Sequence, residues 1–380
     1  MKRVLMVTYH YSPTFSGATL QAFSLAEELR KKGLLCDFLA ANSRNNAPWR
    51  IEKKNGFTVY ALKGKPIIFV SLFAIFLAFR HKKYKAIHFH GFFPGHFLCV
   101  LFAKMIADII VVQKMTKGDA TNCELPIHGS FPWLRRKPLK RIDRFIAISS
   151  DLRNALLAHG VPEGKIALIP NGVNTQLFHQ AATNDQNNDK IATKPDQLIL
   201  VYSGSIDKRK NVHLLIKALQ SLIQLSGLTH KDVQLLVAGP VLDHGYYQEI
   251  EEYIQCHDLE SQIFFLGHME QPNLANLYAN ATLFVFAGTN EGLPNAVIEA
   301  KSSGLPIVAF DAYGVRDVVR NGVDGYLVLF GDTNHFAEKI RTLLLDNDLR
   351  QLMTSQAILD VQKRYSFKVV AEKYLQEIYQ

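Results

Sequence analysis

Two glutamates eight positions apart, Glu291 and Glu299, are the residues best placed to do chemistry in this chain of 380 residues. Between them Pro294 suits a first helical position, and Gly304 suits the end of the same short helix. The backbone N–H groups near Asn295 would then form an anion site. Glu299 could accept two ribose hydroxyls, as acidic residues do in nucleotide sites, and Glu291 could accept hydroxyls of a sugar. Acidic residues also favour a first helical turn on dipole grounds, so the spacing alone leaves both interpretations open.

A second candidate is the run of three cations, Lys208, Arg209 and Lys210, that follows the apolar segment Leu198–Gly204. A diphosphate leaving group gains negative charge as its bond to a sugar breaks, and fixed cations stabilise that charge. Lys210 is the first choice because we expect a helix to begin beside it, at a strand end where doubly wound sheets bind ligands. A solvated turn is the alternative interpretation.

Weaker candidates lie in the first third of the chain. Gly17 follows the strand-like run Val4–Tyr9 and enters a helix, so its backbone could approach a phosphate or a sugar. The segment lacks the G-x-G-x-x-G spacing of nicotinamide-binding loops. His88, His90 and His96 cluster around one strand end without convincing metal spacing, and we interpret them as core or loop histidines.

The elements that must position these residues are apolar runs alternating with helical segments, which predicts parallel sheets covered by helices. The runs are Val4–Tyr9, Ala86–His90, Ile109–Gln113 and Phe145–Ser149, followed by Leu198–Gly204, Val233–Gly239, Ile263–Gly267, Leu283–Ala287 and Ile307–Phe310. The alternation restarts near residue 198, after a polar stretch at 180–197 that we interpret as a linker or surface loop. The length suits two domains, so we predict two similar α/β units in series.

Charge is unevenly distributed along a composition that is otherwise globular, with 48% hydrophobic and 20% charged residues. Residues 1–180 hold 26 Lys and Arg against 10 Asp and Glu, a net +16, whereas 181–380 hold 17 against 24, a net −7. The basic first half predicts a polyanionic partner, either nucleic acid or anionic lipid. Nucleic acid is disfavoured because the cations lack a binding motif with interleaved aromatic residues.

The most apolar segment, 66–79, is too short to cross a bilayer, which takes about 20 residues. Its flanking cations are Lys63, Lys65, Arg80, Lys82, Lys83 and Lys85. Such a helix suits an anionic membrane surface, and a helix buried between the sheet and its neighbours is the alternative. Four scattered cysteines and a short apolar run after Met1 indicate a reducing compartment rather than export. We therefore expect a cytoplasmic protein, peripheral on the inner face of the cytoplasmic membrane.

Taken together, these segments resemble the retaining glycosyltransferases of family 4 (glycosyl transferases group 1), which have the GT-B fold. The resemblance covers nearly the whole chain and is densest from Leu266 to Val328. That part holds the E-x7-E pattern followed by Ala-x-x-x-Gly-x-Pro-Ile-Val. The segments Ile148-Ser149 and Ile169–Asn174, with Phe178, look like the family's approach to the linker. The resemblance implies two Rossmann-like domains that face a cleft.

For the donor, the resemblance implies that the nucleotide binds the second domain. Glu299 would hold the ribose, Lys210 would meet the diphosphate, and the transferred sugar would be held by Glu291 with the backbone of Leu293, Pro294 and Asn295. Many members have Arg where this chain has Ser205, so one phosphate contact would be a hydroxyl or be replaced by Lys208 or Arg209. The family uses no metal or other cofactor, and its donor phosphate takes the proton of the acceptor.

On the acceptor side, the first domain departs from the family. Thr116, two residues after Lys114, occupies the place where many members have His. Either the acceptor pocket differs from that of other members, or activity itself is in question.

The implied domains are an acceptor and membrane-side domain at 1–175, a linker at 176–197 and a nucleotide-sugar domain at 198–365, with a C-terminal helix at 366–380 that returns to the first domain. We predict a hexosyltransferase that moves a sugar from a UDP- or GDP-sugar to a lipid-linked or saccharide acceptor. The expected pathway is the biosynthesis of a surface polysaccharide (capsule, O-antigen, lipopolysaccharide or exopolysaccharide). The alternatives are a non-catalytic GT-B scaffold, which Thr116 permits, and a GT-B sugar-nucleotide epimerase.

Overall fold

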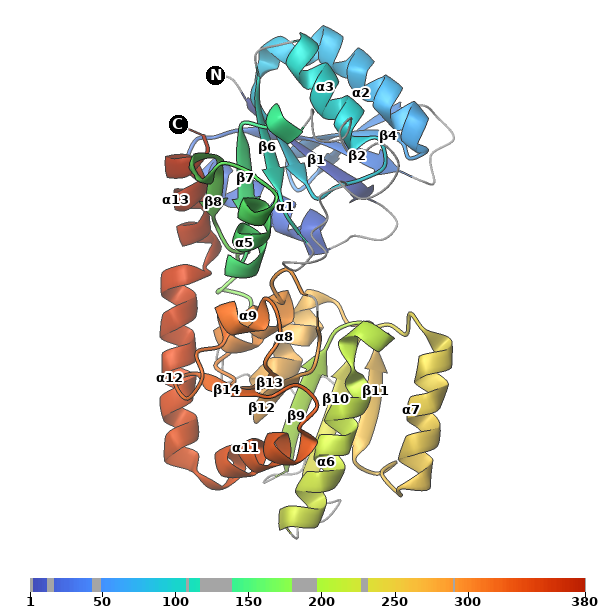
Figure 1. The fold of residues 1–380 in the computed structure, drawn as a ribbon, viewed down its shortest axis with the longest axis vertical. Coiled ribbons are helices and arrows are strands. Elements are labelled where there is room, and N and C mark those ends of the chain that lie inside the picture. The colour runs from blue at the N-terminus through green and yellow to red at the C-terminus, as the bar shows by residue number, and fades with distance from the viewer. Residues whose placement is uncertain are drawn as a thin grey trace. The chain divides into compact units, whose positions relative to one another are not determined.

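The chain forms two α/β units, each with a parallel sheet covered by helices (Figure 1). The computed structural model describes residues 3–11, 17–42, 49–106, 109–116, 139–179, 197–226, 232–289 and 291–379. One unit consists of Met1–Gly172 with Phe367–Gln380, and the other consists of Val173–Ser366. Both are doubly wound, as the alternation of apolar runs predicts.

The first unit is built on an eight-stranded sheet with the order β3-β4-β2-β1-β5-β6-β7-β8. Its strands are β1 (Arg3–Tyr11), β2 (Cys36–Asn42), β3 (Trp49–Lys54), β4 (Phe57–Lys63), β5 (Tyr84–His90), β6 (Ile110–Lys114), β7 (Arg144–Ala147) and β8 (Ile166–Leu168). Only β3 runs antiparallel, because a two-residue turn at Asn55 and Gly56, both with positive φ, folds it back onto β4. This turn is the signature of a tight hairpin, and it leaves β3 at the edge of the sheet.

Five helices of the described residues cover the two faces of this sheet. The helices are α1 (Gly17–Lys31), α2 (Pro66–Arg80), α3 (His96–Ile106), α5 (Ser150–Ala158) and α13 (Phe367–Glu377). Figure 1 shows α2 and α3 side by side, and α1 packs on α13. Phe73 of α2 contacts Phe89 of β5, whereas the adjacent His88 contacts Tyr374 of α13. Because successive residues of a strand point to opposite faces, α2 and α13 cover opposite faces.

The second unit has a six-stranded parallel sheet with the order β11-β10-β9-β12-β13-β14. Its strands are β9 (Leu198–Ser203), β10 (Val233–Ala238), β11 (Ile263–Gly267), β12 (Leu283–Phe286), β13 (Ile307–Phe310) and β14 (Gly325–Val328). Its helices are α6 (Val212–Ser226), α7 (His244–Cys256), α8 (Gln271–Ala279), α9 (Asn295–Ser302), α10 (Val315–Val318), α11 (Thr333–Leu345) and α12 (Asn347–Arg364). The chain builds outward from β9 to β11 and then returns to the other side of β9 with β12. The carboxyl ends of β9 and β12 therefore form the switch point at which such sheets bind ligands.

The division between the units falls at Val173, slightly before the predicted boundary at 175. The N–H of Val173 donates to the Tyr365 carbonyl at 2.8 Å, which ties the start of the second unit to the end of α12. The predicted linker at 176–197 includes Phe178, but this ring is buried in the second unit against Tyr278, with centroids 5.9 Å apart. The start of that segment is thus packed structure, and 180–196 lie outside the described residues. At the other end the last helix begins at Phe367, rather than at 366, and packs on α1.

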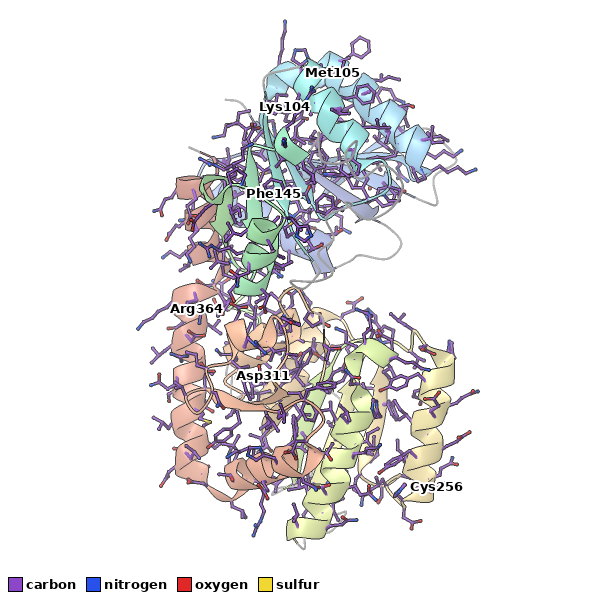
Figure 2. All side chains as sticks on the ribbon, in the orientation of Figure 1. Lys104, Met105, Phe145, Cys256, Asp311 and Arg364 are labelled. Carbon is purple, nitrogen blue, oxygen red and sulfur yellow. The ribbon has the colours of Figure 1, made fainter. Side chains whose placement is uncertain are left out.

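Helix α2 is apolar on both of its sides. Phe69, Phe73 and Leu77 are buried, while Ile67 and Phe79 are 82% and 86% exposed. The neighbouring α3 exposes Leu98 and Met105, and Figure 2 labels Met105 with Lys104 on this helix. The two interpretations of segment 66–79 therefore each describe one face of the same helix. Within the described residues, no helix combines the length and hydrophobicity that crossing a bilayer requires.

Candidate functional site

Lys210 and Glu291 meet at the switch point of the second sheet. Lys210 ends a short 3₁₀ turn (Lys208–Lys210) after β9, and its ammonium forms an ion pair with the carboxylate of Glu291. Both side chains are largely buried, at 15% and 17% exposure. The ammonium also lies 6.0 Å from the ring centroid of Phe286, at the end of β12. A cation and a carboxylate from two neighbouring strand ends are thus held together where a ligand of this fold binds.

A network of hydrogen bonds from Asn211 joins the loops that carry this pair. Asn211 adopts the left-handed conformation, with φ 51°, and its amide donates to the carbonyls of Arg209 and Ala287, both at 3.1 Å. The N–H of Thr289 donates to the same Arg209 carbonyl at 3.1 Å. Asn tolerates positive φ better than most residues, which explains this residue type at the turn. The loop after β9 is therefore fixed to the loop after β12.

A third loop supports Glu291 from behind. Gly314, at φ 75°, lies so close that a Cβ added there would be 2.4 Å from the Glu291 carbonyl oxygen. Only glycine combines this conformation with this approach. Beside the pair, burial raises the pKa of the Tyr202 hydroxyl well above its ordinary value, and the negative charges of Glu291 and Asp207 add to the effect. Tyr202 therefore stays neutral next to the ion pair.

The segment from Leu293 to Asn295 leads into α9. The helix begins at Asn295, with Pro294 as its N-cap, so the prediction that Pro294 is the first helical residue is wrong by one position. The ψ of Pro294 is 103°, an extended value, although its ring-fixed φ of −75° suits either state. Leu293 is buried beneath the loop. At the far end Gly304 takes φ 81°, and the N–H of Leu305 donates to the Ala300 carbonyl at 3.0 Å, closing the helix as predicted.

Glu299 lies in α9, one turn beyond that start. Burial raises its pKa to about 8, although the side chain keeps some exposure. Its charge in turn contributes to the raised pKa of Tyr278, after the larger effect of burial. Within the described residues Glu299 forms no ion pair. A carboxylate that has lost water without gaining a cation is suited to uncharged hydroxyl donors, which would replace the lost hydration.

Ser205 and Arg209 are held together by Asp207. The Ser205 hydroxyl donates to Asp207 at 2.8 Å, and the Arg209 guanidinium donates to the same carboxylate at 3.1 Å. Lys208 pairs instead with Glu249 of α7 at 3.7 Å, with both side chains exposed. Of the three consecutive cations, Lys210 alone contacts Glu291 in the described structure, and the Ser205 proton is already committed.

The first unit carries the residues predicted for the acceptor side. Lys114 ends β6 and is 3% exposed, and burial lowers the pKa of its ammonium to about 7. Thr116 follows, close enough to Gly91 that a Cβ there would lie 3.1 Å from the threonine oxygen. Gly17 begins α1 and is exposed, but residues 12–16 before it lie outside the described part. Lys114 lies at the carboxyl end of a strand of this sheet, and Thr116 and Gly17 follow such ends in the chain.

The three histidines that cluster in the sequence, His88, His90 and His96, are buried core residues of the first unit. His88 hydrogen-bonds to the Tyr379 hydroxyl at 2.6 Å, and its ring stacks on His90 with centroids 4.1 Å apart. Burial lowers the pKa of His96 to about 3, so its ring is neutral. Among the described side chains, no group of three or more His, Cys, Asp or Glu is arranged to hold a metal ion.

Two family models together cover most of the chain. The model described as Glycosyltransferase Family 4 matches residues 15–177, and the model described as Glycosyl transferases group 1 matches residues 183–360. This chain belongs to the family 4 glycosyltransferases. The second match contains the whole of the Lys210–Glu291 site.

Named relatives and solved structures agree with this assignment. The capsular polysaccharide biosynthesis glycosyltransferase CapM of Staphylococcus aureus is 27% identical over 234 residues, which are 60% of this chain and 59% of CapM. An uncharacterized glycosyltransferase of Methanocaldococcus jannaschii is 22% identical over 98% of this chain and 96% of its own length.

The crystal structure of Anabaena HepE with UDP and glucose superposes with TM-score 0.76 at 19% identity, covering 100% of each chain. The structure of sucrose-phosphate synthase of Thermosynechococcus elongatus superposes with TM-score 0.80 at 21% identity, covering 99% of this chain and 98% of its own. The predicted GT-B fold is thereby confirmed.

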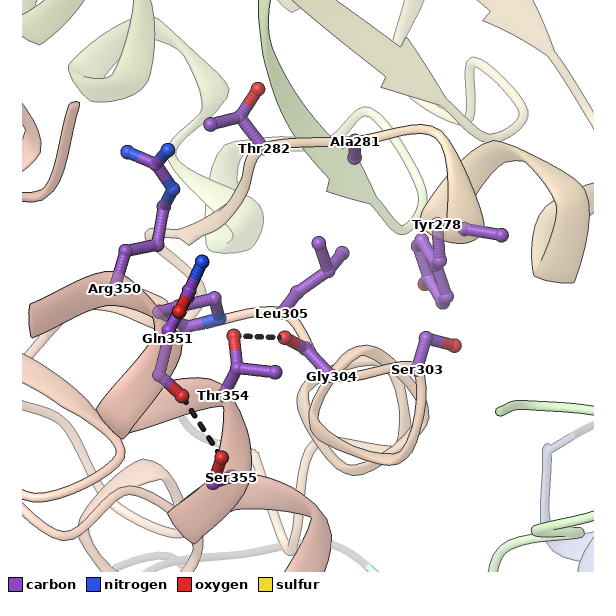
Figure 3. Close-up of a pocket in the computed structure, with 12 residues that line it drawn as sticks. Tyr278, Ala281, Thr282, Ser303, Gly304, Leu305, Arg350, Gln351, Thr354 and Ser355 are labelled. Carbon is purple, nitrogen blue, oxygen red and sulfur yellow. Dashed lines mark hydrogen bonds between the residues drawn. The ribbon is translucent and has the colours of Figure 1, made fainter. Parts of the chain in front are cut away.

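This glycosyltransferase also has a pocket of 370 Å³ in the second unit, away from the switch point (Figure 3). It is lined by Thr282 and Pro306, which precede β12 and β13, and by Arg350 and Thr354 of α12. The Thr354 hydroxyl donates to the Gly304 carbonyl at 2.8 Å across its floor. The pocket therefore lies at the amino ends of the strands, opposite Lys210 and Glu291.

Sequence reasoning missed three residues that shape the Lys210–Glu291 site: Asp207, Asn211 and Gly314. A signal existed for the first two, because Asp commonly caps the start of a helical turn and Asn commonly ends one in the left-handed conformation. The role of Gly314 depends on how closely a distant loop approaches, and no local pattern encodes that distance.

Proposed function

We propose that this enzyme transfers a hexosyl group from a UDP- or GDP-sugar to a lipid-linked or saccharide acceptor during surface polysaccharide synthesis. The transfer proceeds with retention of configuration and without a metal. The observation that carries the proposal is the Lys210–Glu291 pair at the switch point of the second sheet, with Glu299 in the helix α9 that follows. The name of CapM and that of an Escherichia coli relative, a UDP-Gal:alpha-D-GlcNAc-diphosphoundecaprenol alpha-1,3-galactosyltransferase with 23% identity over 270 residues, support this pathway.

The roles follow from charge. Lys210 supplies a fixed cation for the diphosphate, whose negative charge grows as the bond to the sugar breaks. Glu291 accepts hydroxyls of the transferred sugar, and Glu299 accepts those of the ribose. Without donor, the ion pair keeps both charges of Lys210 and Glu291 compensated in a site that excludes much water. With donor, Lys210 gains phosphate oxygens as partners and holds them next to the reacting carbon. The acceptor proton leaves on the donor phosphate, so the site needs no separate protein base.

The outer faces of α2 and α3 support placement of the enzyme on an anionic membrane in the cytoplasm. Ile67, Phe79 and Met105 expose large apolar side chains there, and burying each would contribute about 1.5–3 kcal/mol. Lys82 and Lys83, both exposed, supply positive charge just after the end of α2. Apolar insertion combined with cations matches an anionic bilayer surface, where a lipid-linked acceptor would reside.

A screen of donors tests the proposal. Thermal shifts of the purified enzyme are measured with UDP-Glc, UDP-Gal, UDP-GlcNAc and GDP-Man, and with free UDP and GDP. The same screen is run on Lys210→Ala and on a matched control, Lys208→Ala, whose exposed side chain pairs with Glu249. We expect one nucleotide series to stabilise the wild type and the Lys208 control but not Lys210→Ala. Equal stabilisation of all three proteins would contradict the assigned site.

A further inference from the structure

Three buried polar residues form a row across the first sheet. Met6 of β1 pairs with His88 of β5, so Thr8 comes level with His90, and His90 pairs directly with Lys114 of β6. Level residues of neighbouring parallel strands point to the same face, here the face covered by α1 and α13. The row of Thr8, His90 and Lys114 therefore lies in one line at the carboxyl end of the sheet.

Each member of this row has a side-chain N or O atom that lacks a hydrogen-bond partner among the described residues. The Thr8 hydroxyl and His90 Nδ1 are buried without a hydrogen-bond partner, and the other His90 nitrogen lies 3.3 Å from the Met6 sulfur. Lys114 is 3% exposed, and no ion pair or hydrogen bond of its ammonium occurs among the described residues. Buried polar groups are normally satisfied, so three such neighbours require an explanation.

Lys301 in the second unit shows what a structural buried lysine looks like in this chain. Its ammonium, also fully buried, donates to Asp324 at 3.0 Å, to Asp360 at 2.7 Å and to the Val318 carbonyl at 2.6 Å. Two carboxylates thus compensate one buried cation, as stability demands. Lys114 is nearly as buried, yet among the described residues no carboxylate or carbonyl accepts a hydrogen bond from its ammonium, and burial is the only cause that lowers its pKa to about 7.

Among the described residues no acidic side chain neutralises this cation, and the partner that would neutralise it is an anion. A bound oxyanion would receive the Lys114 ammonium and could accept further hydrogen bonds from the Thr8 hydroxyl and the His90 ring. Lys114 is itself one of the two residues predicted for the acceptor side, and the other, Thr116, lies against Gly91, which directly follows His90.

We propose that Thr8, His90 and Lys114 form an oxyanion-binding site that holds a phosphoryl or carboxyl group of the acceptor. The anion site stands on the geometry of the first unit, whereas its assignment to the acceptor rests on the proposed function. A lipid-linked acceptor would supply the group as a phosphate, and a saccharide acceptor as the carboxylate of a uronic acid. In either case the site selects acceptors that carry a negative charge near the attacked hydroxyl.

Labelling of Lys114 by pyridoxal phosphate tests this site independently of turnover. The aldehyde condenses with a neutral amine, borohydride traps the adduct, and mass spectrometry of peptides locates it. UDP and GDP are present in excess to occupy the donor site. We expect at least tenfold more adduct at Lys114 with pyridoxal phosphate than with pyridoxal, and protection by pyrophosphate or by glucuronate. Stronger protection by pyrophosphate indicates the phosphate source, and stronger protection by glucuronate indicates the carboxylate source.

No adduct at Lys114, equal labelling by the two aldehydes, or no protection by either anion would overturn the site. Lys114→Met, which removes the charge and keeps a similar length, and Lys114→Arg, which keeps the charge, complete the test. We expect both variants to retain the thermal shift with nucleotide, and the Met variant alone to lose at least tenfold in kcat/KM for the acceptor. A normal thermal shift with unchanged acceptor kinetics in Lys114→Met would contradict the assignment of this site to the acceptor. It would not contradict the proposed function.

Discussion

Replacing Glu299 with Gln separates the stability of the second unit from its ability to bind nucleotide. The pKa of this carboxyl is raised by burial to about 8 from the ordinary 4.5. The folded state therefore binds the proton more tightly than the unfolded state, and the wild type loses stability as pH rises from 4.5 to 8. At about 1.4 kcal/mol per pKa unit the limit is about 5 kcal/mol, and solvent screening of the partly exposed carboxyl reduces it to about 2 kcal/mol.

We expect Glu299→Gln to match the wild type in stability at pH 4.5 and to exceed it at pH 8.5. For a unit of this size, 2 kcal/mol corresponds to roughly 4–8 °C in the Tm of the second unit, measured by calorimetry. Binding should change in the opposite direction. Hydroxyl donors favour the ionised carboxylate, so the wild-type affinity for UDP or GDP should rise between pH 6.5 and 8.5.

Calorimetric titrations with nucleotide decide the outcome. At pH 8.5 the Gln variant should bind at least tenfold more weakly, because a hydrogen bond to a charged group contributes about 1.5–3 kcal/mol. The variant should also lose the rise in affinity that Glu299 causes, since the phosphate titration of the nucleotide is common to both proteins and cancels. Equal affinities with the same pH dependence would refute the placement of the ribose on Glu299.

Further predictions concern the backbone around the Lys210–Glu291 pair and the exposed apolar side chains of α2, here called the membrane face. Gly314→Ala and its control Gly322→Ala both place a Cβ at positive φ, but only the first meets another atom, the Glu291 oxygen, so we expect thermal shifts with nucleotide to fail in Gly314→Ala alone. Asn211→Ala should destabilise the second unit by about 1–3 kcal/mol in urea melts, because the part-buried carbonyl of Ala287 loses the amide that donates to it, and Asn211→Gly should recover part of the loss, since it relieves only the strain at φ 51°. Ile67→Ser with Phe79→Ser should release the enzyme from anionic vesicles in a sedimentation assay while turnover of a soluble acceptor stays unchanged; retained binding would refute the membrane face.

Much of the fold could be predicted from the sequence because hydrophobic periodicity repeats along the chain. The alternation of apolar runs indicates two parallel α/β units, and the pattern around Glu291 indicates the family. Both Glu291 and Lys210 could be assigned to strand ends for the same reason. That β9 and β12 are neighbours, so that these two side chains meet, follows from the switch-point topology of the GT-B fold rather than from either segment.

Other features depend on contacts that no local pattern contains. The Ser205 hydroxyl donates to Asp207, two residues later, rather than pointing toward a ligand. The sequence alone does not show which of these two partners the hydroxyl takes. The burial of Lys114 depends on which strands flank β6, since a terminal lysine of a strand is usually solvated. Helix α2 shows the same limit: its uniform hydrophobicity predicts an apolar environment but not which side faces the protein.

The most direct test of the central claim is an NMR analysis of sugar transfer with metal chelated throughout. The wild type, Lys210→Ala and Lys208→Ala are incubated with the donor that gives the thermal shift, with and without a lipid-linked saccharide acceptor. We predict a product with the donor's anomeric configuration, formed only with acceptor and lost by at least a hundredfold in Lys210→Ala, the scale of removing one transition-state contact. Nucleotide binding without transfer to any acceptor, a sugar isomer formed without acceptor, or an inverted product would contradict the account.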